Sequence, residues 1–562
     1  MEKVNAAILI CRILKEHNIK YVFALGGGHV FPIIKHLKEN DIKLIHVRHE
    51  QAAAYAADAW ARVTRNPGVC LVTAGCGLTN ALTGLHVASS THSSVVCLSG
   101  QHPTTEDFMG SFQEAYGSDI VRSFAKYTKR VTDWSTIEKD LRLAFRAAMI
   151  PPQGVSLVEI PINILMSEGN IHEQKSGGKI FDLNTVRSQG DLNQIEKAVE
   201  LLHKAERPLF AGGDGIFWSN AEVELKDIAE LTHTPVYCRR AGQGALDEAN
   251  RLAVRGSWKK PFTSNADVVI AVGMKFWSGE NFGQPPTWTD QGVYVQIDSS
   301  AERVGWHVPA EIGIVGDPKL VLRQMINKIK EVELDFTTKA NSVWIKQVDQ
   351  VRASFERVIR DRAEEYADIV PIHPDRIIKD MVSVADRDVT VINDSFILSG
   401  YVNQWFMAHS TAQLVDAGPF GPVGAGVGMG IGAQLGRPGK QVIVVSGDGG
   451  IGIGGMDLET AARYKIPIVI LVYNNSSWGG IVIKHQEEDG PGMPLVMLPD
   501  IRYDKVFEPL GVYTEQVEKP DEIIPALKRS FESGKPALIN IISSDKYGHP
   551  TLGSNLLGST KL

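Results

Sequence analysis

The residues between 441 and 479 combine groups that could hold a metal ion together with a phosphate. Asp448 lies in the glycine-rich sequence Gly447-Asp448-Gly449-Gly450, and Asn475 follows the next apolar run. A carboxylate and an amide oxygen are hard ligands that suit Mg²⁺, which also accepts phosphate oxygens. Glycine lacks the Cβ that would keep a phosphate away from the backbone. These residue types in this order predict a site for a magnesium diphosphate.

Two buried strands must bring these groups together. The apolar run 442–445 precedes the glycines, a helix is expected over about 455–464, and a second apolar run, 466–473, precedes Asn474 and Asn475. Ligands of open parallel sheets bind beyond the carboxyl ends of the strands, so the side chains after both runs should meet in one crevice. An ordinary turn from strand to helix would explain the glycines alone, but it would not explain their combination with the paired asparagines.

Length and composition are those of an ordinary globular protein with several domains. The chain has 562 residues, of which 43% are hydrophobic and 22% charged, and its formal net charge is −7. This length predicts about three domains. The charge gives no reason to expect nucleic acid or an anionic membrane as a partner, and no apolar run reaches the roughly 18 residues of a membrane span. We expect a cytoplasmic protein whose five cysteines are buried, reduced thiols.

Apolar runs alternate with helical segments along the whole chain, which predicts an α/β fold with three doubly wound parallel sheets. Strands are expected at 21–25, 43–47, 68–73 and 94–98 in the first unit and at 208–211, 267–272 and 293–297 in the second. The predicted divisions are a first domain over 1–168, a linker over 169–190, a middle domain over 191–335, a helical connection over 336–371, a third domain over 372–545 and a tail over 546–562. The tail could close over a site as a lid, or it could be a frayed end.

The order strand, GDGG, helix, strand and Asn-Asn resembles the signature of enzymes that use thiamine diphosphate (ThDP). Three α/β units with this signature in the third resemble the whole length of the superfamily of acetolactate synthase, pyruvate oxidase and benzaldehyde lyase. The resemblance implies that the first domain binds the pyrimidine ring of ThDP and the third binds its diphosphate with Mg²⁺. It also implies that these two domains come from different subunits, so we expect a homodimer or a homotetramer.

The resemblance also implies roles for residues of the first domain. Glu50 matches the family's activating glutamate, which hydrogen-bonds the pyrimidine N1′; a glutamate that merely interacts with the helix dipole is the plain alternative. Gln113 matches a Phe-Gln pair whose amide lies over the reacting carbon, although a solvated loop residue would look the same. Gly28 and His29 match a small residue and a histidine beside the substrate, where the histidine could relay a proton or cap a turn.

Other positions would hold the cofactor. Residues 75–80 resemble a loop of the pyrimidine domain, with Cys76 in place of the family's proline, and Asn80 is the polar group expected there. Val423 is expected beneath the cofactor, where an aliphatic side chain enforces its folded conformation, with Val427 and Met429 as rivals. The predicted cofactor residues are Gly28, Gly75, Asn80, Val423, Gly447, Asp448, Gly449, Gly450, Asn475, Ser477, Trp478 and Gly479, and the predicted metal ligands are Asp448, Asn475 and Ser477, the last through its carbonyl oxygen.

Two branches of the superfamily share features with this chain. Residues 271–288 resemble the middle domain of 2-hydroxyacyl-CoA lyases and oxalyl-CoA decarboxylases, whereas Gly28-His29 and residues 476–479 resemble benzaldehyde lyase. Both branches make or break a carbon–carbon bond beside a hydroxyl-bearing carbon, through a carbanion on the cofactor. We therefore expect a ThDP- and Mg²⁺-dependent lyase or carboligase that acts on a small molecule, either a 2-hydroxyacyl-CoA or a 2-hydroxyketone.

Two alternatives stay open. One is an enzyme of the acetolactate synthase type, which decarboxylates a 2-oxo acid, ligates the fragment to a second one, and often retains FAD in the middle domain. The other is a non-catalytic scaffold that binds ThDP, because fold alone does not determine function. On the preferred interpretation FAD is not expected.

Overall fold

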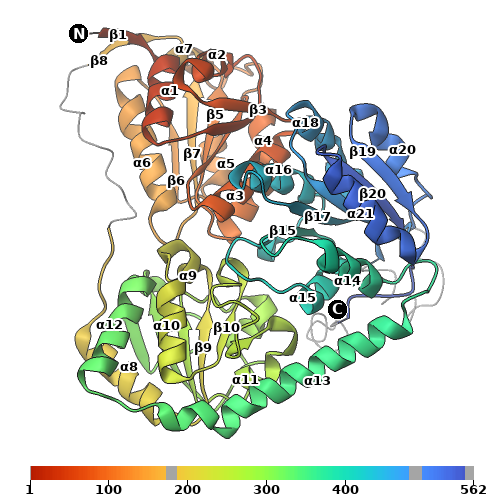
Figure 1. The fold of residues 1–562 in the computed structure, drawn as a ribbon. Coiled ribbons are helices and arrows are strands. Elements are labelled where there is room, and N and C mark those ends of the chain that lie inside the picture. Colours follow the sequence, from red (N-terminus) through yellow and green to blue (C-terminus); the bar gives the residue numbers. More distant parts are fainter. Residues whose placement is uncertain (1, 172–185, 480–496, 551–562) are drawn as a thin grey trace.

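The computed structural model describes residues 2–171, 186–479 and 497–550. Three α/β units follow one another along the chain, and each contains a sheet of six parallel strands (Figure 1). The N-terminal unit is red to orange in Figure 1, the middle unit is yellow to green, and the C-terminal unit is teal to blue. This architecture confirms the predicted class of three doubly wound α/β domains. The exact divisions between the domains stay a prediction.

The N-terminal sheet has the strand order β3-β2-β4-β5-β7-β6. Its strands are β2 (Tyr21–Leu25), β3 (Lys43–His46), β4 (Gly68–Val72), β5 (Val95–Gln101), β6 (Tyr127–Arg130) and β7 (Val155–Pro161), and the main helices are α1 (Ala6–Glu16), α2 (Phe31–Leu37), α3 (Glu50–Thr64), α4 (Cys76–Ser90), α5 (Gly117–Val121) and α6 (Ile137–Met149). All four predicted strands are present, because continuous apolar runs become strands that are buried on both faces, as β4 and β5 are throughout.

The middle sheet has the order β11-β10-β9-β12-β13-β14. Its strands are β9 (Pro208–Gly212), β10 (Val236–Cys238), β11 (Ala253–Val254), β12 (Val268–Val272), β13 (Val293–Asp298) and β14 (Ile312–Val315), and its helices are α8 (Leu192–Lys204), α9 (Asp214–Ser219), α10 (Glu222–Thr232), α11 (Lys260–Thr263) and α12 (Pro318–Glu331). The long helix α13 (Val343–Glu365) then crosses to the C-terminal unit along the lower edge of Figure 1.

The C-terminal sheet has the order β16-β15-β17-β18-β20-β19, which repeats the winding of the N-terminal sheet. Its strands are β15 (Thr390–Asp394), β16 (Leu414–Asp416), β17 (Val442–Gly447), β18 (Val469–Asn474), β19 (Tyr513–Val517) and β20 (Ala537–Ile542), and its helices are α14 (Pro374–Val384), α15 (Phe396–Trp405), α16 (Gly426–Gly436), α17 (Asp448–Gly454), α18 (Leu458–Arg463), α20 (Tyr503–Phe507) and α21 (Ile523–Glu532). No described helix is both long and apolar enough to cross a membrane.

One local expectation was wrong. Helix was expected only from about 455, but α17 already begins at Asp448 and ends at Gly454, and α18 follows from Leu458, because burial in the sheet crevice overrides the preference of Asp-Gly-Gly for a turn. Residues 168–171, at the predicted boundary between the first domain and the linker, form the short strand β8 (Glu168–Ile171), which pairs antiparallel with β1 (Glu2–Asn5). Each strand has only four residues, too few to show a periodicity. Residues 172–185 of the predicted linker and 551–562 of the predicted tail lie outside the described residues.

Helices α3 and α16 join the N-terminal and C-terminal units through close backbone contact. A Cβ at Gly432 would lie 2.0 Å from the carbonyl oxygen of Ala56, and a Cβ at Gly428 would lie 3.1 Å from the Cα of Ala52. Side chains of both helices belong to one hydrophobic core. Because the distance between packed helices depends on the residues at the contact, alanine facing glycine brings these two helices unusually near to each other.

We predict that Gly432→Ala destabilises the protein. Alanine favours a helix over glycine by roughly 0.5–1 kcal/mol, but the new methyl group would overlap a main-chain oxygen, and overpacking costs about 1–3 kcal/mol. The matched control is Gly452→Ala in α17, whose Cβ would lie 4.0 Å from its nearest neighbour, Tyr503 Oη. Thermal unfolding should give a lower midpoint for Gly432→Ala only. Equal midpoints for the two variants would show that the α3–α16 contact is not tightly packed.

Candidate functional site

A cavity of about 470 Å³ opens at the carboxyl ends of β15, β16, β17 and β18. Its walls come from the segments 393–399, 416–423, 447–450 and 473–479. This is the crevice in which an open parallel sheet is expected to bind its ligand. The cavity brings together the predicted residues Val423, Gly447, Asp448, Gly449, Gly450, Asn475, Ser477, Trp478 and Gly479.

Asp448 places a buried carboxylate on the wall of this cavity. The residue is 2% exposed, its Oδ1 accepts a hydrogen bond from Gly449 N at 2.8 Å, and its Oδ2 accepts one from Ser477 N at 3.1 Å. Burial raises the pKa of the Asp448 carboxyl to about 6. In the part of the chain that the structure describes, no lysine or arginine forms an ion pair with it. A buried carboxylate without a cationic partner suits a divalent cation.

Asn475 and Ser477 leave polar atoms without partners at the same wall. The two residues are 7% and 3% exposed, and neither Asn475 Nδ2 nor Ser477 Oγ has a hydrogen-bond partner among the described residues. Asn474, by contrast, donates its amide to Asn540 Oδ1 at 3.0 Å and to the Ile501 carbonyl at 3.1 Å. Because buried polar atoms are normally paired, the unpaired ones indicate a polar ligand. The second asparagine of the pair therefore faces the cavity, and the first stabilises the strand ends.

The donor set differs from that of a transition-metal site. The described residues contain no group of three or more His, Cys, Asp or Glu side chains that could hold a metal ion. One carboxylate, one amide and one main-chain carbonyl are a suitable protein contribution for Mg²⁺, which keeps phosphate and water oxygens as its other ligands. The residues present thus fit a magnesium diphosphate.

Glycines keep the wall around Asp448 open. A Cβ at Gly447 would meet nothing within 4 Å, so its backbone borders free space, whereas a Cβ at Gly449 would lie 2.6 Å from the ring of Trp478. Val423 is 44% exposed and lines the cavity. The two alternative residues, Val427 and Met429, are 3% and 1% exposed and belong to the hydrophobic core, and neither lines the cavity.

Glu50 begins α3 in the N-terminal unit and is only 5% exposed. Its Oε2 accepts a hydrogen bond from Asn80 Nδ2 at 3.0 Å, and His49 caps the helix by accepting from Gln51 N at 3.1 Å. A Cβ at Gly77 would lie 3.6 Å from Glu50 Oε1, so the start of α4 closes on the carboxyl group. The predicted residues Glu50 and Asn80 are therefore direct neighbours.

His29, Thr73 and Gln113 form a second group in this unit. Thr73 Oγ1 lies 3.4 Å from His29 Nδ1 and donates to Gln113 Oε1 at 3.4 Å. Burial lowers the pKa of His29, which favours the neutral imidazole. Gln113 has a φ of 59°, and a Cβ at Gly75, which has a φ of 55°, would lie 2.5 Å from the Gln113 carbonyl oxygen. Glycine is therefore required at position 75 to hold the Gln113 backbone near the group.

Gln113 also donates its amide to Cys76 Sγ at 3.2 Å. Cys76 is exposed, which corrects the expectation that the cysteines are buried thiols. Cys11, Cys70 and Cys97 are buried, and Cys238 is half-buried. The exposed thiol arises because Cys76 begins α4 at the surface where the Gln113 loop passes.

The loop that carries Gln113 is held by Glu114, a residue that the sequence did not single out. The Glu114 carboxylate accepts hydrogen bonds from Phe108 N at 2.7 Å, Gly110 N at 2.8 Å, Ser111 N at 3.0 Å and Tyr116 Oη at 2.6 Å. The Tyr116 hydroxyl is the main reason why the pKa of Glu114 is lowered. No motif marks this role, because the acceptor is defined only by loop amides that converge on it.

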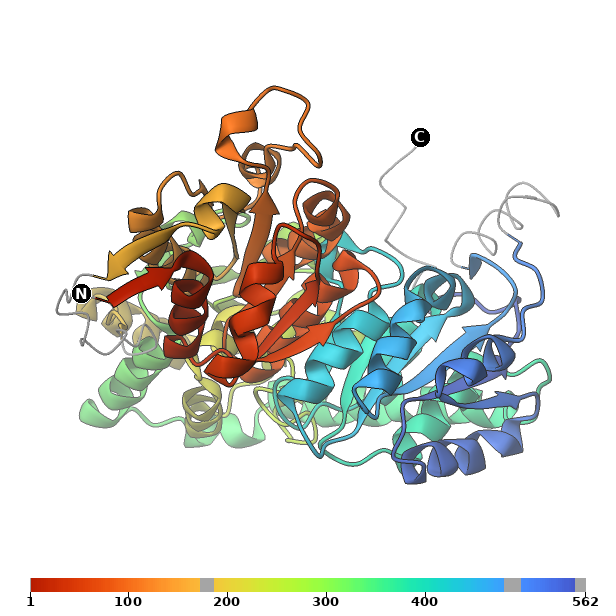
Figure 2. The same ribbon diagram turned by 90° about the horizontal axis from the view of Figure 1, so that it is seen from above.

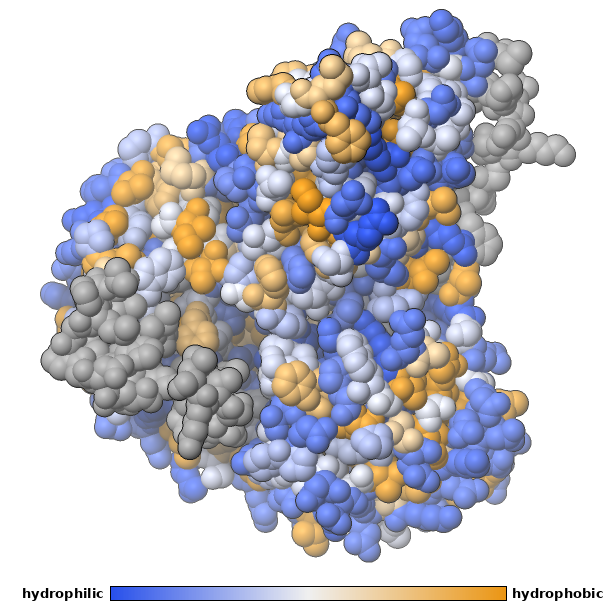
Figure 3. Space-filling model, turned by 180° about the vertical axis from the view of Figure 1, so that it is seen from behind, coloured by the Kyte–Doolittle hydropathy of each residue, from blue (hydrophilic) through white to orange (hydrophobic). Residues whose placement is uncertain are grey.

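The same loop exposes large hydrophobic side chains. Phe108, Met109 and Phe112 are 85%, 74% and 78% exposed, on the orange loop that stands away from the N-terminal unit in Figure 2. Near the cavity of the C-terminal unit, Phe396 and Phe420 are 51% and 45% exposed. Figure 3 shows that hydrophobic residues on one face of the molecule form several separate patches among hydrophilic ones. Large apolar side chains are thus exposed beside both groups of predicted residues.

The two groups of predicted site residues do not share a cavity within one chain. All the described residues that line the cavity at Asp448 belong to the C-terminal unit. Glu50, Asn80, His29, Gly28, Gly75 and Gln113 all lie in the N-terminal unit. Each unit thus provides one part of the predicted site.

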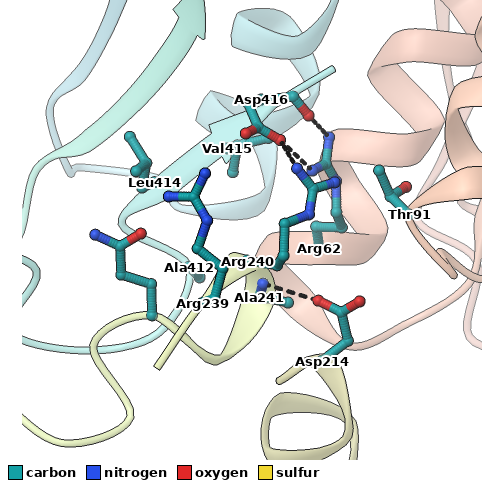
Figure 4. A pocket seen from close by; sticks show the side chains of 11 residues that line it. Arg62, Thr91, Asp214, Arg239, Arg240, Ala241, Ala412, Leu414, Val415 and Asp416 are labelled. Atoms are coloured by element: carbon teal, nitrogen blue, oxygen red, sulfur yellow. Dashed lines mark hydrogen bonds and ion pairs between the residues drawn. The ribbon is translucent and has the colours of Figure 1, made fainter. Parts of the chain in front are cut away.

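Small cavities lie at the carboxyl ends of the strands in the middle unit. Two cavities there measure about 20 Å³ each, which is room for roughly one water molecule. Figure 4 shows one of them, where Arg240 Nη1 lies 2.7 Å from Asp416 Oδ1 and Arg62 Nη2 donates to the Asp416 carbonyl at 2.7 Å. The three residues come from the middle, C-terminal and N-terminal units, so this cavity lies at the junction of all three.

Comparisons with known proteins give matches along the chain. Residues 4–121 match the thiamine pyrophosphate enzyme N-terminal TPP binding domain, residues 195–325 the central domain and residues 398–541 the C-terminal TPP binding domain. An acetolactate synthase large subunit from Mycobacterium tuberculosis is 31% identical over 554 residues, which cover 98% of this chain and 97% of the relative. A 2-hydroxyacyl-CoA lyase from Arabidopsis thaliana is 28% identical over 554 residues, which cover 96% and 95%. The human 2-hydroxyacyl-CoA lyase 1 is 26% identical over 555 residues, with 96% and 95% covered.

We predict that Glu114→Gln loosens the loop without unfolding the protein. Glutamine keeps one acceptor oxygen and turns the other into a donor, so about half of the accepted hydrogen bonds are lost. Hydrogen exchange of the amides of residues 108–111 should become at least about tenfold faster. Glu106→Gln is the control, because the Glu106 carboxylate accepts from the hydroxyl of Ser111 but from no described main-chain amide of this loop. Equal exchange in both variants would rule out Glu114 as the residue that holds the loop.

Proposed function

This chain belongs to the thiamine pyrophosphate enzymes, and from that premise we propose that it is a ThDP- and Mg²⁺-dependent lyase or carboligase. Its substrate on this proposal is a 2-hydroxyacyl-CoA or a 2-hydroxyketone, whose carbon–carbon bond beside the hydroxyl-bearing carbon is broken or formed. The observation that carries the proposal is the cavity in which a buried carboxylate, Asp448, adjoins the unpaired polar atoms of Asn475 and Ser477.

The Asp448 carboxylate, the Asn475 amide oxygen and the Ser477 carbonyl would hold Mg²⁺, and the backbone at Gly447 would face the diphosphate. When bound, ThDP supplies a thiazolium carbon that adds to a carbonyl carbon and accepts the electron pair of the broken bond. Val423 would support the ring system from the cavity floor. The size of the cavity, about 470 Å³, lies in the range of cofactor sites.

Residues of the N-terminal unit would move or hold protons. Glu50 would share a proton with the pyrimidine N1′, and its low exposure, with Asn80 as its hydrogen-bonding neighbour, supports this role. His29, kept neutral by burial, would accept a proton from a substrate hydroxyl and return it to the product. Gln113 would hydrogen-bond a substrate oxygen, and Thr73 would orient both side chains from between them.

A second copy of the chain would complete the site. Since the cavity at Asp448 is lined from the C-terminal unit, Glu50 would reach it from a partner subunit. The exposed Phe108, Met109 and Phe112 on one side and Phe396 and Phe420 on the other would then be covered. We propose a homodimer as the smallest active form, and a homotetramer would contain the same pair.

One feature supports the lyase branch. His29 lies beside Thr73 and Gln113, as a role of the histidine at the substrate requires. The acetolactate synthase-type reaction is the second candidate, because an acetolactate synthase is the more similar relative at 31% identity, against 28% for a 2-hydroxyacyl-CoA lyase.

We predict that Asp448→Ala abolishes Mg²⁺-dependent binding of ThDP. The variant lacks the charged ligand, so the dissociation constant for ThDP should rise at least about 100-fold. Isothermal titration calorimetry with and without Mg²⁺ measures the change. Asp388→Ala is the control, because Asp388 is a surface carboxylate paired with Lys440 at 2.5 Å. If Asp448→Ala binds ThDP with wild-type affinity in the presence of Mg²⁺, Asp448 is not a metal ligand.

We predict that Glu50→Gln keeps ThDP binding but lowers turnover by about 10²–10⁴-fold, the usual contribution of a positioned acid or base. The wild-type chain with ThDP and Mg²⁺ is offered a 2-hydroxyacyl-CoA, benzoin and pyruvate in parallel, and the products are identified by mass.

Cleavage of either hydroxyl-bearing substrate supports the lyase. Acetolactate from pyruvate, together with the yellow colour of a bound flavin, would favour the synthase. If the chain turns over none of these substrates and does not exchange the ThDP C2 proton, the non-catalytic scaffold is the remaining interpretation. If Glu50→Gln is fully active, Glu50 has no role in the mechanism.

A further inference from the structure

The floor of the cofactor cavity is a loop, residues 417–425, that runs from the end of β16 to the start of α16. Gly418, Gly421 and Gly424 in this loop have φ values of 67°, 60° and 88°. Glycines in the left-handed region leave a backbone with little stiffness of its own. Val423 lies between two of them and is 44% exposed, so it is not held by burial in a core. Contacts from outside the loop must therefore fix its position.

Asp394, the last residue of β15, holds the end of the loop that leads into α16. Its Oδ1 accepts hydrogen bonds from Gly424 N and Ala425 N, both at 3.2 Å, and the nearby Gly426 amide also acts to lower the pKa of the carboxyl. Ser446 Oγ donates to its Oδ2 at 3.4 Å. Three consecutive main-chain amides thus converge on one carboxylate from a neighbouring strand. The first residues of a helix have no intrahelical acceptor for their amides, and Asp394 supplies one.

Asp416, the last residue of β16, holds the other end. Its Oδ1 accepts from Gly418 N at 3.1 Å and from Arg240 Nη1 at 2.7 Å, while its carbonyl accepts from Arg62 Nη2 (Figure 4). The loop is thus held at both ends by carboxylates of adjacent parallel strands. Asp416 is neutralised by arginines, whereas Asp394 has no ion pair with any lysine or arginine that the structure describes.

A carboxylate at position 394 is unexpected, because Asp394 lines a cavity proposed to receive an anionic diphosphate. Like charges in one cavity repel each other, and burial adds to the cost of the ionised form. Burial raises the pKa of Asp394 to about 6, and the amides of residues 424–426 oppose that shift. An asparagine could keep its oxygen on the amides of Gly424 and Ala425, but it would place N–H groups where Oδ2 now accepts from Ser446 Oγ, and it would lack the charge that strengthens these hydrogen bonds. A carboxylate therefore holds the loop amides more strongly than an asparagine does.

We propose that Asp394 is a positioning residue of the cofactor site: it fixes residues 424–426 and thereby keeps Val423 in place on the cavity floor. The inference rests on the proposed function, since Val423 matters only if ThDP occupies the cavity. Asp394 acts through the loop and through Val423, while Asp448, Asn475 and Ser477 would hold the metal from other segments of the same cavity.

The test compares Asp394→Asn, Val423→Ala and the double variant in the full-length protein. The dissociation constant for ThDP in the presence of Mg²⁺ is measured by calorimetry, and hydrogen exchange of the amides 424–426 is measured without ThDP. Asp394→Asn should weaken ThDP binding and accelerate exchange at these amides, each by about tenfold or more. Amides of β17 should exchange at the wild-type rate. The double variant should bind ThDP no more weakly than Val423→Ala, because Asp394 has no side chain left to position once Val423 is truncated.

Each other result overturns the inference. Faster exchange with unchanged ThDP affinity would make Asp394 a helix cap without a role in the site. Additive effects of the two substitutions would mean that Asp394 does not act through Val423. If the wild-type chain does not bind ThDP, the proposed function itself is overturned. If the wild-type chain binds ThDP and Asp394→Asn binds it with the same affinity, only this inference is overturned.

Ala425→Pro tests the same contact from the other side and serves where Asp394→Asn does not fold. Ala425 has a φ of −79°, which proline tolerates, and the substitution removes one donor to Asp394 while the carboxylate stays in place. It should weaken ThDP binding in the same direction but less than Asp394→Asn does. Wild-type affinity in Ala425→Pro, with faster exchange at residues 424 and 426, would contradict the inference.

Discussion

The C-terminal unit contains a buried carboxylate that no described lysine or arginine neutralises. Asp448 is 2% exposed and receives main-chain amides but no cationic side chain from the described residues. Moving an ionised carboxylate out of water costs several kcal/mol unless an opposite charge accompanies it. In the proposed function a divalent cation would supply that charge, and its phosphate ligands would meet the unpaired donors of Asn475 and Ser477 and the open backbone at Gly447. The same burial that makes the carboxylate costly in isolation would then favour binding of the ion.

The contact between α3 and α16 relates this cavity to the N-terminal unit. Gly428 faces Ala52 and Gly432 faces Ala56, so the two helices run in the same direction with their starts at the same end. Glu50 is the first residue of α3, and the loop that carries Val423 leads into α16. One tightly packed helix pair thus fixes how the two groups of site residues lie in each chain. In the proposed dimer the two groups of one chain serve different cavities, and the helix pair would keep both sites in register.

The sequence predicted those parts of the structure that local patterns determine. Continuous apolar runs identified several strands in each of the three sheets, and the residues around Asp448 and Asn475 lie on one cavity as the parallel-sheet rule predicts. Features that depend on distant segments were missed. The pairing of β1 with β8 joins residues from opposite ends of the N-terminal unit. Asp394 and Glu114 carry no motif, since each is defined only by amides that the folded chain brings to it.

Asp394 and Glu114 also show why these loops are held by charge and not by packing. A loop anchored by its own hydrophobic side chains would bury them, and they would then be lost as contacts for a ligand. Glu114 instead collects the amides of residues 108–111 and leaves Phe112 exposed beside Gln113. Asp394 collects the amides of residues 424–426 and leaves Val423 exposed in the cavity. A carboxylate that accepts several main-chain amides orders the backbone at each place, so the apolar side chain stays available to the ligand at a small cost in conformational entropy upon binding.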